Sequence, residues 1–91
     1  MPEADITGGL RWATEPSRAA TRGHRIIAWV VAVQGTSVID GATDLPEVAR
    51  RRAIPVSTFY DHLKALRTKF GLTPPGVELL GVTEAIRNDF S

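Results

Sequence analysis

The stretch LPEVARRRAIPVSTFYDHLKALRTKFGL, Leu45–Leu72, decides the fold of this chain. It begins directly after Asp44, and Glu47 stands three residues beyond that aspartate, a spacing typical of a capped helix amino terminus. Pro55 stops this helix, because the residue before a proline is pushed away from helical angles. The stretch therefore predicts one helix before Pro55 and a second one after it.

The second predicted helix starts at Pro55 or Ser57 and carries one apolar stripe. Apolar side chains recur at intervals of three or four residues, which places them on one face of a helix: Phe59, Leu63, Leu66 and Phe70. Gly71 follows and suits a left-handed cap. We predict that this helix spans residues 57–70.

Small residues stand where two helices would cross and turn. Ala49 lies midway along the first helix, Ala53 is at the bend, and Ile54 follows as an apolar residue pinned under the core. Two helices joined by so short a turn can place the second one in the DNA major groove while the first braces it. The sequence therefore predicts a helix-turn-helix.

The flanking segments extend this unit to a winged domain. Thr14 and Pro16 suit the start of a helix that ends near Gln34, and TSVID, residues 36–40, is β-prone and too short for a helix. After Gly71, residues 72–82 outline a hairpin with Pro74, Pro75 and Gly76 at its tip, and TEAIRNDF, residues 83–90, suits a last helix.

The predicted fold class is mainly α with a small β-hairpin (α+β), a winged helix-turn-helix in the order helix, strand, helix, helix, hairpin, helix. We expect residues 1–13, with the pair Gly8 and Gly9, to form a flexible arm apart from Trp12, which suits a core edge. Residues 14–91 would form the domain.

Composition narrows the class of protein. The chain has 91 residues, enough for one small domain, and its 43% hydrophobic and 23% charged residues are ordinary for a globular protein. It has no cysteine, which excludes disulfides, thiolate zinc sites and thiol catalysis. The apolar run over residues 26–33 is too short to span a membrane, so we expect a cytoplasmic protein.

Basic charge is concentrated in the middle of the chain. The net charge is only +1, but residues 18–69 hold nine Lys and Arg against four Asp and Glu. This distribution agrees with a polyanionic partner, although a solvated helix face would look the same.

Two families share motifs with this stretch. The pattern T-F-x-x-H-x-x-x-L-x-x-K-F-G-L over residues 58–72 resembles the end of the recognition helix in LuxR-type regulators. The run IAWVVAVQGTSV over residues 27–38, with residues 47–72 and LGVTEA over residues 80–85, is similar to the winged amino-terminal domain of LysR-type regulators. Arg52 departs from both, because they place a buried leucine there, and Ala53 replaces a common glycine.

This resemblance implies a sequence-specific double-stranded DNA-binding protein, nucleoid-associated and most often a transcriptional regulator. Third-helix positions outside the apolar stripe would face DNA, and base or phosphate contacts are expected from Val56, Ser57, Thr58, Tyr60, Asp61, Lys64, Arg67 and Lys69 with Arg50 and Arg51 of the bracing helix. Asp61 fits a surface that faces DNA only if its carboxylate pairs with an arginine or accepts a hydrogen bond from a cytosine amine. We expect a homodimer, because one helix reads too few base pairs.

Other roles stay open. A protein-protein adaptor could use the same fold, and its helix-turn-helix surface would then be apolar or would have its basic charge interrupted by Asp61 and Glu47. A phage or plasmid accessory factor would bind DNA through the same residues as a regulator and would differ only in its biological role. We do not expect enzymatic activity. His24 and His62 stand far apart in the sequence without metal-ligand spacing, and no phosphate-binding loop or nucleophile motif occurs. His62 suits half-buried packing or a hydrogen bond on the phosphate side rather than catalysis. No cofactor or metal is expected.

Overall fold

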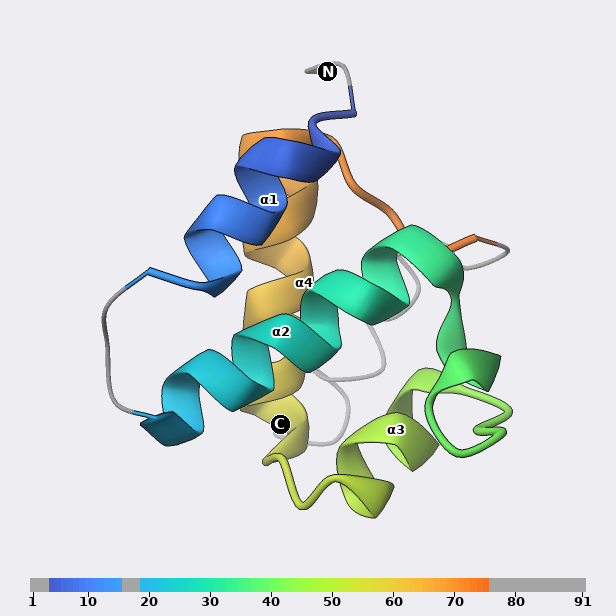
Figure 1. Cartoon of the computed structure of the whole chain (residues 1–91). Coiled ribbons are helices and arrows are strands. Elements are labelled where there is room, and N and C mark those ends of the chain that lie inside the picture. The colour runs from blue at the N-terminus through green and yellow to red at the C-terminus, as the bar shows by residue number, and fades with distance from the viewer. Residues whose placement is uncertain (1–3, 16–18, 76–91) are drawn as a thin grey trace, which may run out of the picture.

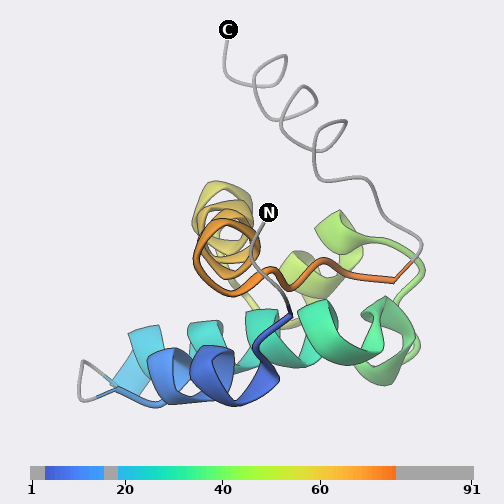
Figure 2. The same cartoon turned by 90° about the horizontal axis from the view of Figure 1, so that it is seen from above.

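A computed structural model describes residues 4–15 and 19–75 of the chain. These residues form four α-helices and one short 3-10 helix, in the order α1 Ile6–Ala13, α2 Ala19–Gln34, η1 Thr36–Val38, α3 Leu45–Arg51 and α4 Val56–Phe70. Helices α1 and α2 lie in one layer, and α4 crosses behind them with α3 at one of its ends (Figure 1). Seen from above, residues 71–75 leave α4 and run toward α3 (Figure 2).

The core lies where α4 meets α2 and α3. Phe59, Leu63 and Leu66 of α4 are fully buried, as the apolar stripe predicted, together with Val31 of α2 and Val48 of α3. This set joins three helices through side chains that have no polar group. Helix α4 is therefore the central element of the described fold.

The predicted amino-terminal cap of α3 and carboxyl-terminal cap of α4 are confirmed, although α3 ends at Arg51, before Pro55. The Asp44 side chain accepts a hydrogen bond of 2.9 Å from the Glu47 amide, so it caps the first turn of α3. Gly71 has a left-handed conformation with φ 66° and donates through its amide to the Arg67 carbonyl at 3.0 Å. Helix α2 also ends as predicted, at Gln34.

Helix α1 corrects the expectation of a flexible arm for Ile6–Ala13, while residues 1–3 of that arm lie outside the described residues. Asp5 caps this helix by accepting from the Gly8 amide at 2.9 Å, and its own amide donates to the Phe70 carbonyl at 2.8 Å. Thr14, expected to start the next helix, instead stands at the carboxyl end of α1. Trp12 is buried, as predicted. Tertiary packing outweighs the weak helix propensity of two adjacent glycines.

Two glycines in helices have opposite surroundings. A Cβ at Gly9 would lie 2.7 Å from Leu72 Cδ1 and 3.1 Å from Trp29 Cδ1, whereas a Cβ at Gly23 of α2 would meet nothing within 4 Å. Gly9→Ala is expected to destabilise the fold by roughly 1 to 3 kcal/mol through overpacking. Gly23→Ala, the matched control, is expected to stabilise it by about 0.5 to 1 kcal/mol. Urea unfolding measures both, and equal shifts of the two midpoints would contradict this packing.

The predicted strand over residues 36–40 is wrong. Thr36–Val38 form the 3-10 helix η1, and the chain then turns through Asp40 and Gly41, which have φ of 53° and 71°. Ile39 is buried while Val38 is exposed. A β-prone segment needs a neighbouring strand to pair with, and the described residues offer none, so a turn replaces it.

The winged fold class is also wrong for the part of the chain that the structure describes, because the only regular elements in residues 4–15 and 19–75 are helices and no strand occurs there. Of the predicted hairpin, residues 72–75 carry no strand either, and Leu72 and Pro74 are buried against the helices. The remainder of that hairpin and the predicted helix over residues 83–90 lie outside the described residues.

Candidate nucleic-acid interface

The turn between α3 and α4 is a compact, fully bonded helix ending. The Ile54 amide donates to the Ala49 carbonyl at 2.9 Å, and the Ala53 amide donates to the Arg50 carbonyl at 3.3 Å. These two bonds are the pair that closes a helix at a left-handed residue, and Ala53 has φ 55°. A non-glycine residue in this conformation costs about 1 to 2 kcal/mol. The expected bend at Ala53 is confirmed.

Ile54 anchors the turn and α4 starts directly after it. The Ile54 side chain is only 4% exposed, as its predicted place under the core requires. Pro55 precedes α4 and its carbonyl accepts from the Phe59 amide at 2.9 Å, which begins the helical hydrogen bonding. The buried Ile54 and Phe59 therefore hold the amino-terminal half of α4 against the body of the protein.

One strip of α4 faces away from the core. Ser57, Asp61, Lys64 and Thr68, here called the α4 strip, follow one another at intervals of four, three and four residues, so they share one helix face. Asp61, Lys64 and Thr68 are exposed and Ser57 is half-buried. The strip offers two hydroxyls, one carboxylate and one ammonium group, which are all able to contact base edges or phosphates.

The other predicted α4 residues lie on the two flanks of this strip. Arg67 is half-buried and lies three residues after Lys64, so the two cations are neighbours. Lys69 lies about 140° around the helix axis from Lys64. Thr58 shares the flank of Lys69, whereas Val56 lies toward Arg67, and both are half-buried. The ten predicted residues therefore do not form a single surface.

Tyr60 departs from the expected exposed face. Its side chain is only 7% exposed, and its ring lies 6.1 Å from that of Phe59, measured between centroids. A sequence signal for this burial exists, because Val56, Tyr60 and Leu63 are spaced by four and three residues and widen the apolar stripe. Tyr60 therefore packs mainly as a core residue at the α3 end of α4.

The three arginines of RRR, residues 50–52, have three different surroundings. Arg51 Nε donates to Glu47 Oε1 at 2.7 Å and its Nη1 donates to the Asp40 carbonyl at 3.1 Å. Arg52 Nη2 lies 3.3 Å from Asp40 Oδ2. Arg50 is 77% exposed and lies 4.0 Å from Glu47 at its closest. Arg50 is therefore the member most open to a phosphate, and the other two hold the loop before α3.

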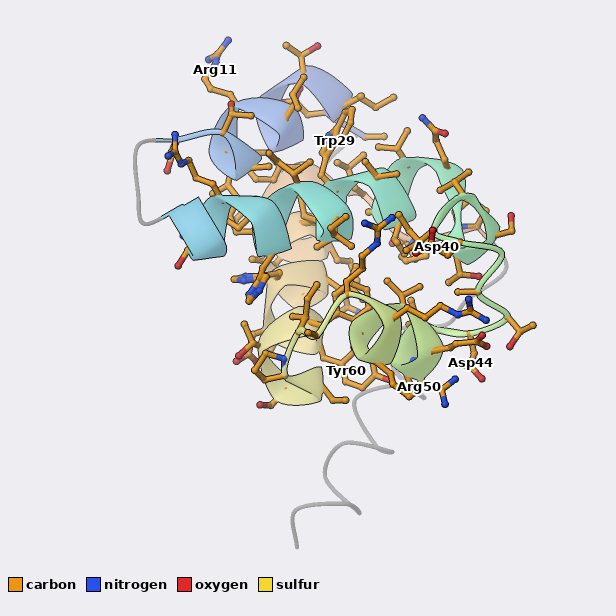
Figure 3. The ribbon with its side chains drawn as sticks, turned by 60° about the horizontal axis from the view of Figure 1, so that its bottom comes forward. Arg11, Trp29, Asp40, Asp44, Arg50 and Tyr60 are labelled. Atoms are coloured by element: carbon orange, nitrogen blue, oxygen red, sulfur yellow. The ribbon has the colours of Figure 1, made fainter. Side chains whose placement is uncertain are left out.

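Arg50 and the amino-terminal part of α4 lie at the same end of the molecule. Figure 3 shows Arg50 and Tyr60 together at this end, with Arg11 of α1 at the opposite end. The structure thus brings Arg50 of α3 to the side of the molecule where α4 begins. Asp44 lies beside Arg50 at this end, and Asp61 is in the amino-terminal half of α4. Lys64 stands midway along α4 and Arg67 in its last turn, while Arg51 and Arg52 each have an acidic neighbour.

Glu47 is the acidic centre of the loop before α3. Its Oε2 accepts from Thr43 Oγ1 at 2.6 Å and from the Thr43 amide at 3.2 Å, while its Oε1 accepts from Arg51. These hydrogen bonds, the Thr43 hydroxyl first, lower the pKa of Glu47 from 4.5 to about 2. The carboxylate is therefore ionised down to acidic pH and keeps Arg51 in place.

Glu47→Gln is expected to lower the free energy of unfolding at pH 7, and this deficit should shrink as the pH falls from about 4.5 toward 2. The sign follows from the lowered pKa in the folded state, since the stabilisation is complete above the unfolded pKa and is lost as the folded carboxylate takes up a proton. Urea unfolding of both proteins at several pH values measures the difference. A deficit that is the same at pH 7 and pH 2 would contradict the account.

His62 joins α4 to the α1–α2 layer rather than to any catalytic group. Its ring meets Trp12 edge-on with centroids 5.7 Å apart, and the Arg25 guanidinium lies 4.5 Å from the Trp12 ring centre. Burial first, then the nearby Arg25 and His24 charges, lower the pKa of His62, although Asp61 opposes this shift. The predicted half-buried packing role is confirmed.

The described residues contain neither a metal-binding cluster nor a membrane-spanning helix. No group of three or more His, Asp or Glu side chains in residues 4–15 and 19–75 is arranged to hold a metal ion. None of the helices described is long and apolar enough to cross a membrane. No protein family, curated protein or solved structure was found that matches this chain.

Proposed function

We propose that this protein binds double-stranded DNA through a helix-turn-helix formed by α3 and α4, with the α4 strip in the major groove. The observation that carries the proposal is the turn between the two helices, four residues from Arg52 to Pro55 with a left-handed bend at Ala53 and a buried Ile54. A turn of this length that carries a second helix with a polar outer face is the arrangement of DNA-reading helix-turn-helix units.

The residues divide into two roles. Ser57 and Asp61, near the start of α4, are placed for base edges, with Asp61 accepting from a cytosine amine as the one partner that suits a carboxylate. Arg50, Lys64 and Arg67 supply phosphate contacts, because guanidinium and ammonium groups neutralise the DNA backbone. Regulation of transcription by a homodimer in the nucleoid is the role that this proposal implies, since one helix reads few base pairs.

The test is a salt titration of binding to a labelled random-sequence duplex. Three phosphate contacts per protomer predict that log K falls with log salt at a slope of about −3 per protomer, and roughly twice that for a dimer. The expected dissociation constant for random sequence is on the order of 1 to 100 μM at physiological salt. Absence of binding at low salt, or binding that does not weaken with salt, would overturn the proposal.

One observation favours a protein adaptor as a second candidate. Asp61 lies in the middle of the α4 strip, and Glu47 and Asp40 engage Arg51 and Arg52, so the surface has mixed charge. A surface of this kind suits a protein partner of complementary charge. Asp61→Asn separates the two candidates, because it should strengthen random-duplex binding by removing repulsion from phosphate and should weaken a protein contact that uses the carboxylate.

A further inference from the structure

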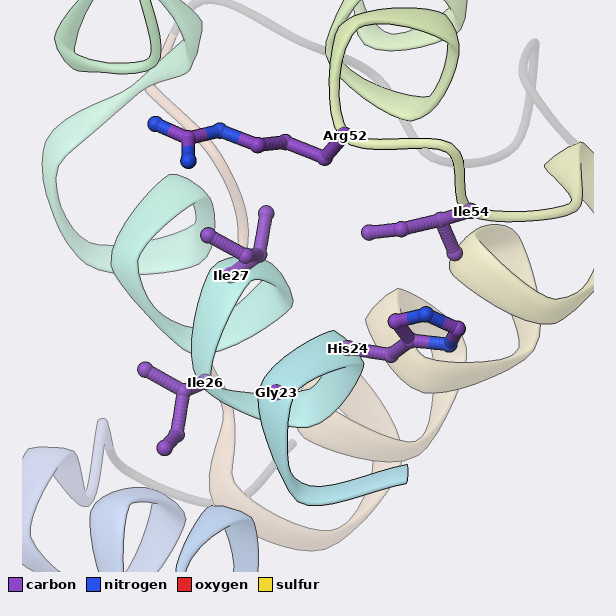
Figure 4. Close-up of a pocket in the computed structure, with 6 residues that line it drawn as sticks. All are labelled: Gly23, His24, Ile26, Ile27, Arg52 and Ile54. Atoms are coloured by element: carbon purple, nitrogen blue, oxygen red, sulfur yellow. The ribbon is translucent and has the colours of Figure 1, made fainter. Parts of the chain in front are cut away.

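A cleft of about 420 Å³ separates α2 from the α3–α4 turn. Its lining residues come from both sides: Gly23, His24, Ile26, Ile27, Arg52 and Ile54. Figure 4 shows Arg52 and Ile54 of the turn on one side and Ile27, His24, Ile26 and Gly23 of α2 on the other. The cleft is distinct from the α4 strip, because no residue of α4 lines it.

The inner part of the cleft is apolar. Ile54 is buried, Ile27 is half-buried and Ile26 is 37% exposed, so three branched side chains form its walls. Gly23 leaves space, because a Cβ there would meet nothing within 4 Å. A surface of this composition gains stability when an apolar group displaces its water.

The polar groups of the cleft favour an anion. Arg52 and His24 are its two nitrogen-bearing side chains, and none of its lining residues is acidic. Arg52 lies 3.3 Å from Asp40, but both side chains are about half exposed, and such surface pairs contribute at most about 1 kcal/mol. The planar guanidinium fork matches a carboxylate, so a bound acid can replace Asp40 as its partner.

We propose that this cleft is a binding site for a small monocarboxylate with an apolar body, whose carboxylate pairs with Arg52 while its hydrocarbon part lies against Ile26, Ile27 and Ile54. The volume is near the lower end of the range for small-molecule sites, so the site suits a small acid, and one with a six-carbon chain is short enough to fit. The site is a property of the α2 and turn residues alone and does not depend on DNA binding.

The test is a titration of the whole chain, labelled with ¹⁵N, with hexanoate, and with hexanol as the matched uncharged probe. Hexanoate should cause saturable amide shifts at Gly23, His24, Ile27, Arg52 and Ile54, with a dissociation constant of about 1 mM, as expected for a ligand of this size. Hexanol should bind at least about tenfold more weakly, because it lacks the charge that pairs with Arg52.

Three variants sharpen the result. Arg52→Gln should weaken hexanoate at least about fivefold, and Arg22→Gln, which removes a cation of α2 outside the cleft, should leave it unchanged. Gly23→Leu should abolish binding by filling the cleft. The proposal is overturned if hexanoate gives no saturable shifts, if hexanol binds as tightly, or if Arg52→Gln and Arg22→Gln have the same effect.

Discussion

Replacing Phe59 by alanine is expected to lower the free energy of unfolding by about 3 to 5 kcal/mol, because it removes a large buried aromatic ring and leaves a cavity. Phe59 is fully buried at the point where α4 meets the rest of the core. Domains of this size are stable by about 5 to 14 kcal/mol, so the variant would retain only part of its stability. The midpoint of thermal unfolding should fall by at least about 12 °C.

The matched control for Phe59→Ala is Leu10→Ala on α1. Leu10 is 39% exposed, and its truncation should change stability by less than about 1 kcal/mol. Thermal unfolding followed by circular dichroism measures both variants. If Phe59→Ala melts within a few degrees of Leu10→Ala, α4 is not the central element of the core and its predicted placement is wrong.

The double variant Lys64→Ala with Arg67→Ala is expected to weaken duplex binding by about a hundredfold at low salt. Each cation lost removes a charge-assisted hydrogen bond to phosphate worth about 1.5 kcal/mol, or roughly tenfold in affinity. The slope of log K against log salt should also fall by about 2 per protomer, because two counterions fewer are released. Fluorescence anisotropy with a labelled duplex measures both quantities.

The control for this variant is Arg11→Ala with Arg22→Ala, which changes the net charge equally. Both arginines are exposed, and they lie on α1 and α2 rather than on the helix-turn-helix. If long-range attraction alone drove binding, the two double variants would lose the same duplex affinity. Direct phosphate contact predicts that only the α4 double variant loses affinity. Equal loss in both would show that binding is not made through Lys64 and Arg67.

The stretch Leu45–Leu72 could be predicted well because its signals are local. A capping aspartate, an apolar stripe and a closing glycine each act within a few residues, and the structure confirms all three. The stop attributed to Pro55 comes earlier, because α3 ends at Arg51 and the chain bends at Ala53. Ser57, Asp61 and Lys64 of the α4 strip followed from the spacing of the apolar stripe, whereas Thr68 was not predicted. Tyr60 was misplaced because Val56, four residues before it, was not counted with Leu63 as part of the buried face.

The elements predicted wrongly depend on contacts that are distant in sequence. Gly9 reads as a helix breaker until Leu72 and Trp29 are seen to lie against it, since only glycine fits that approach. The β-prone segment over residues 36–40 has no strand to pair with among the described residues. Asp40 engages Arg51 and Arg52, which are 11 and 12 residues further along the chain, and no pattern in the sequence indicates those bonds.

The central claim is that α3 and α4 together form a DNA-binding face, and a map of backbone amide shifts on adding a random-sequence duplex at low salt tests it most directly. The account predicts that the largest shifts occur between Arg50 and Thr68, with α1 and the first half of α2 nearly unchanged. Shifts centred on α1 or α2, or no shifts at a duplex excess, would contradict it.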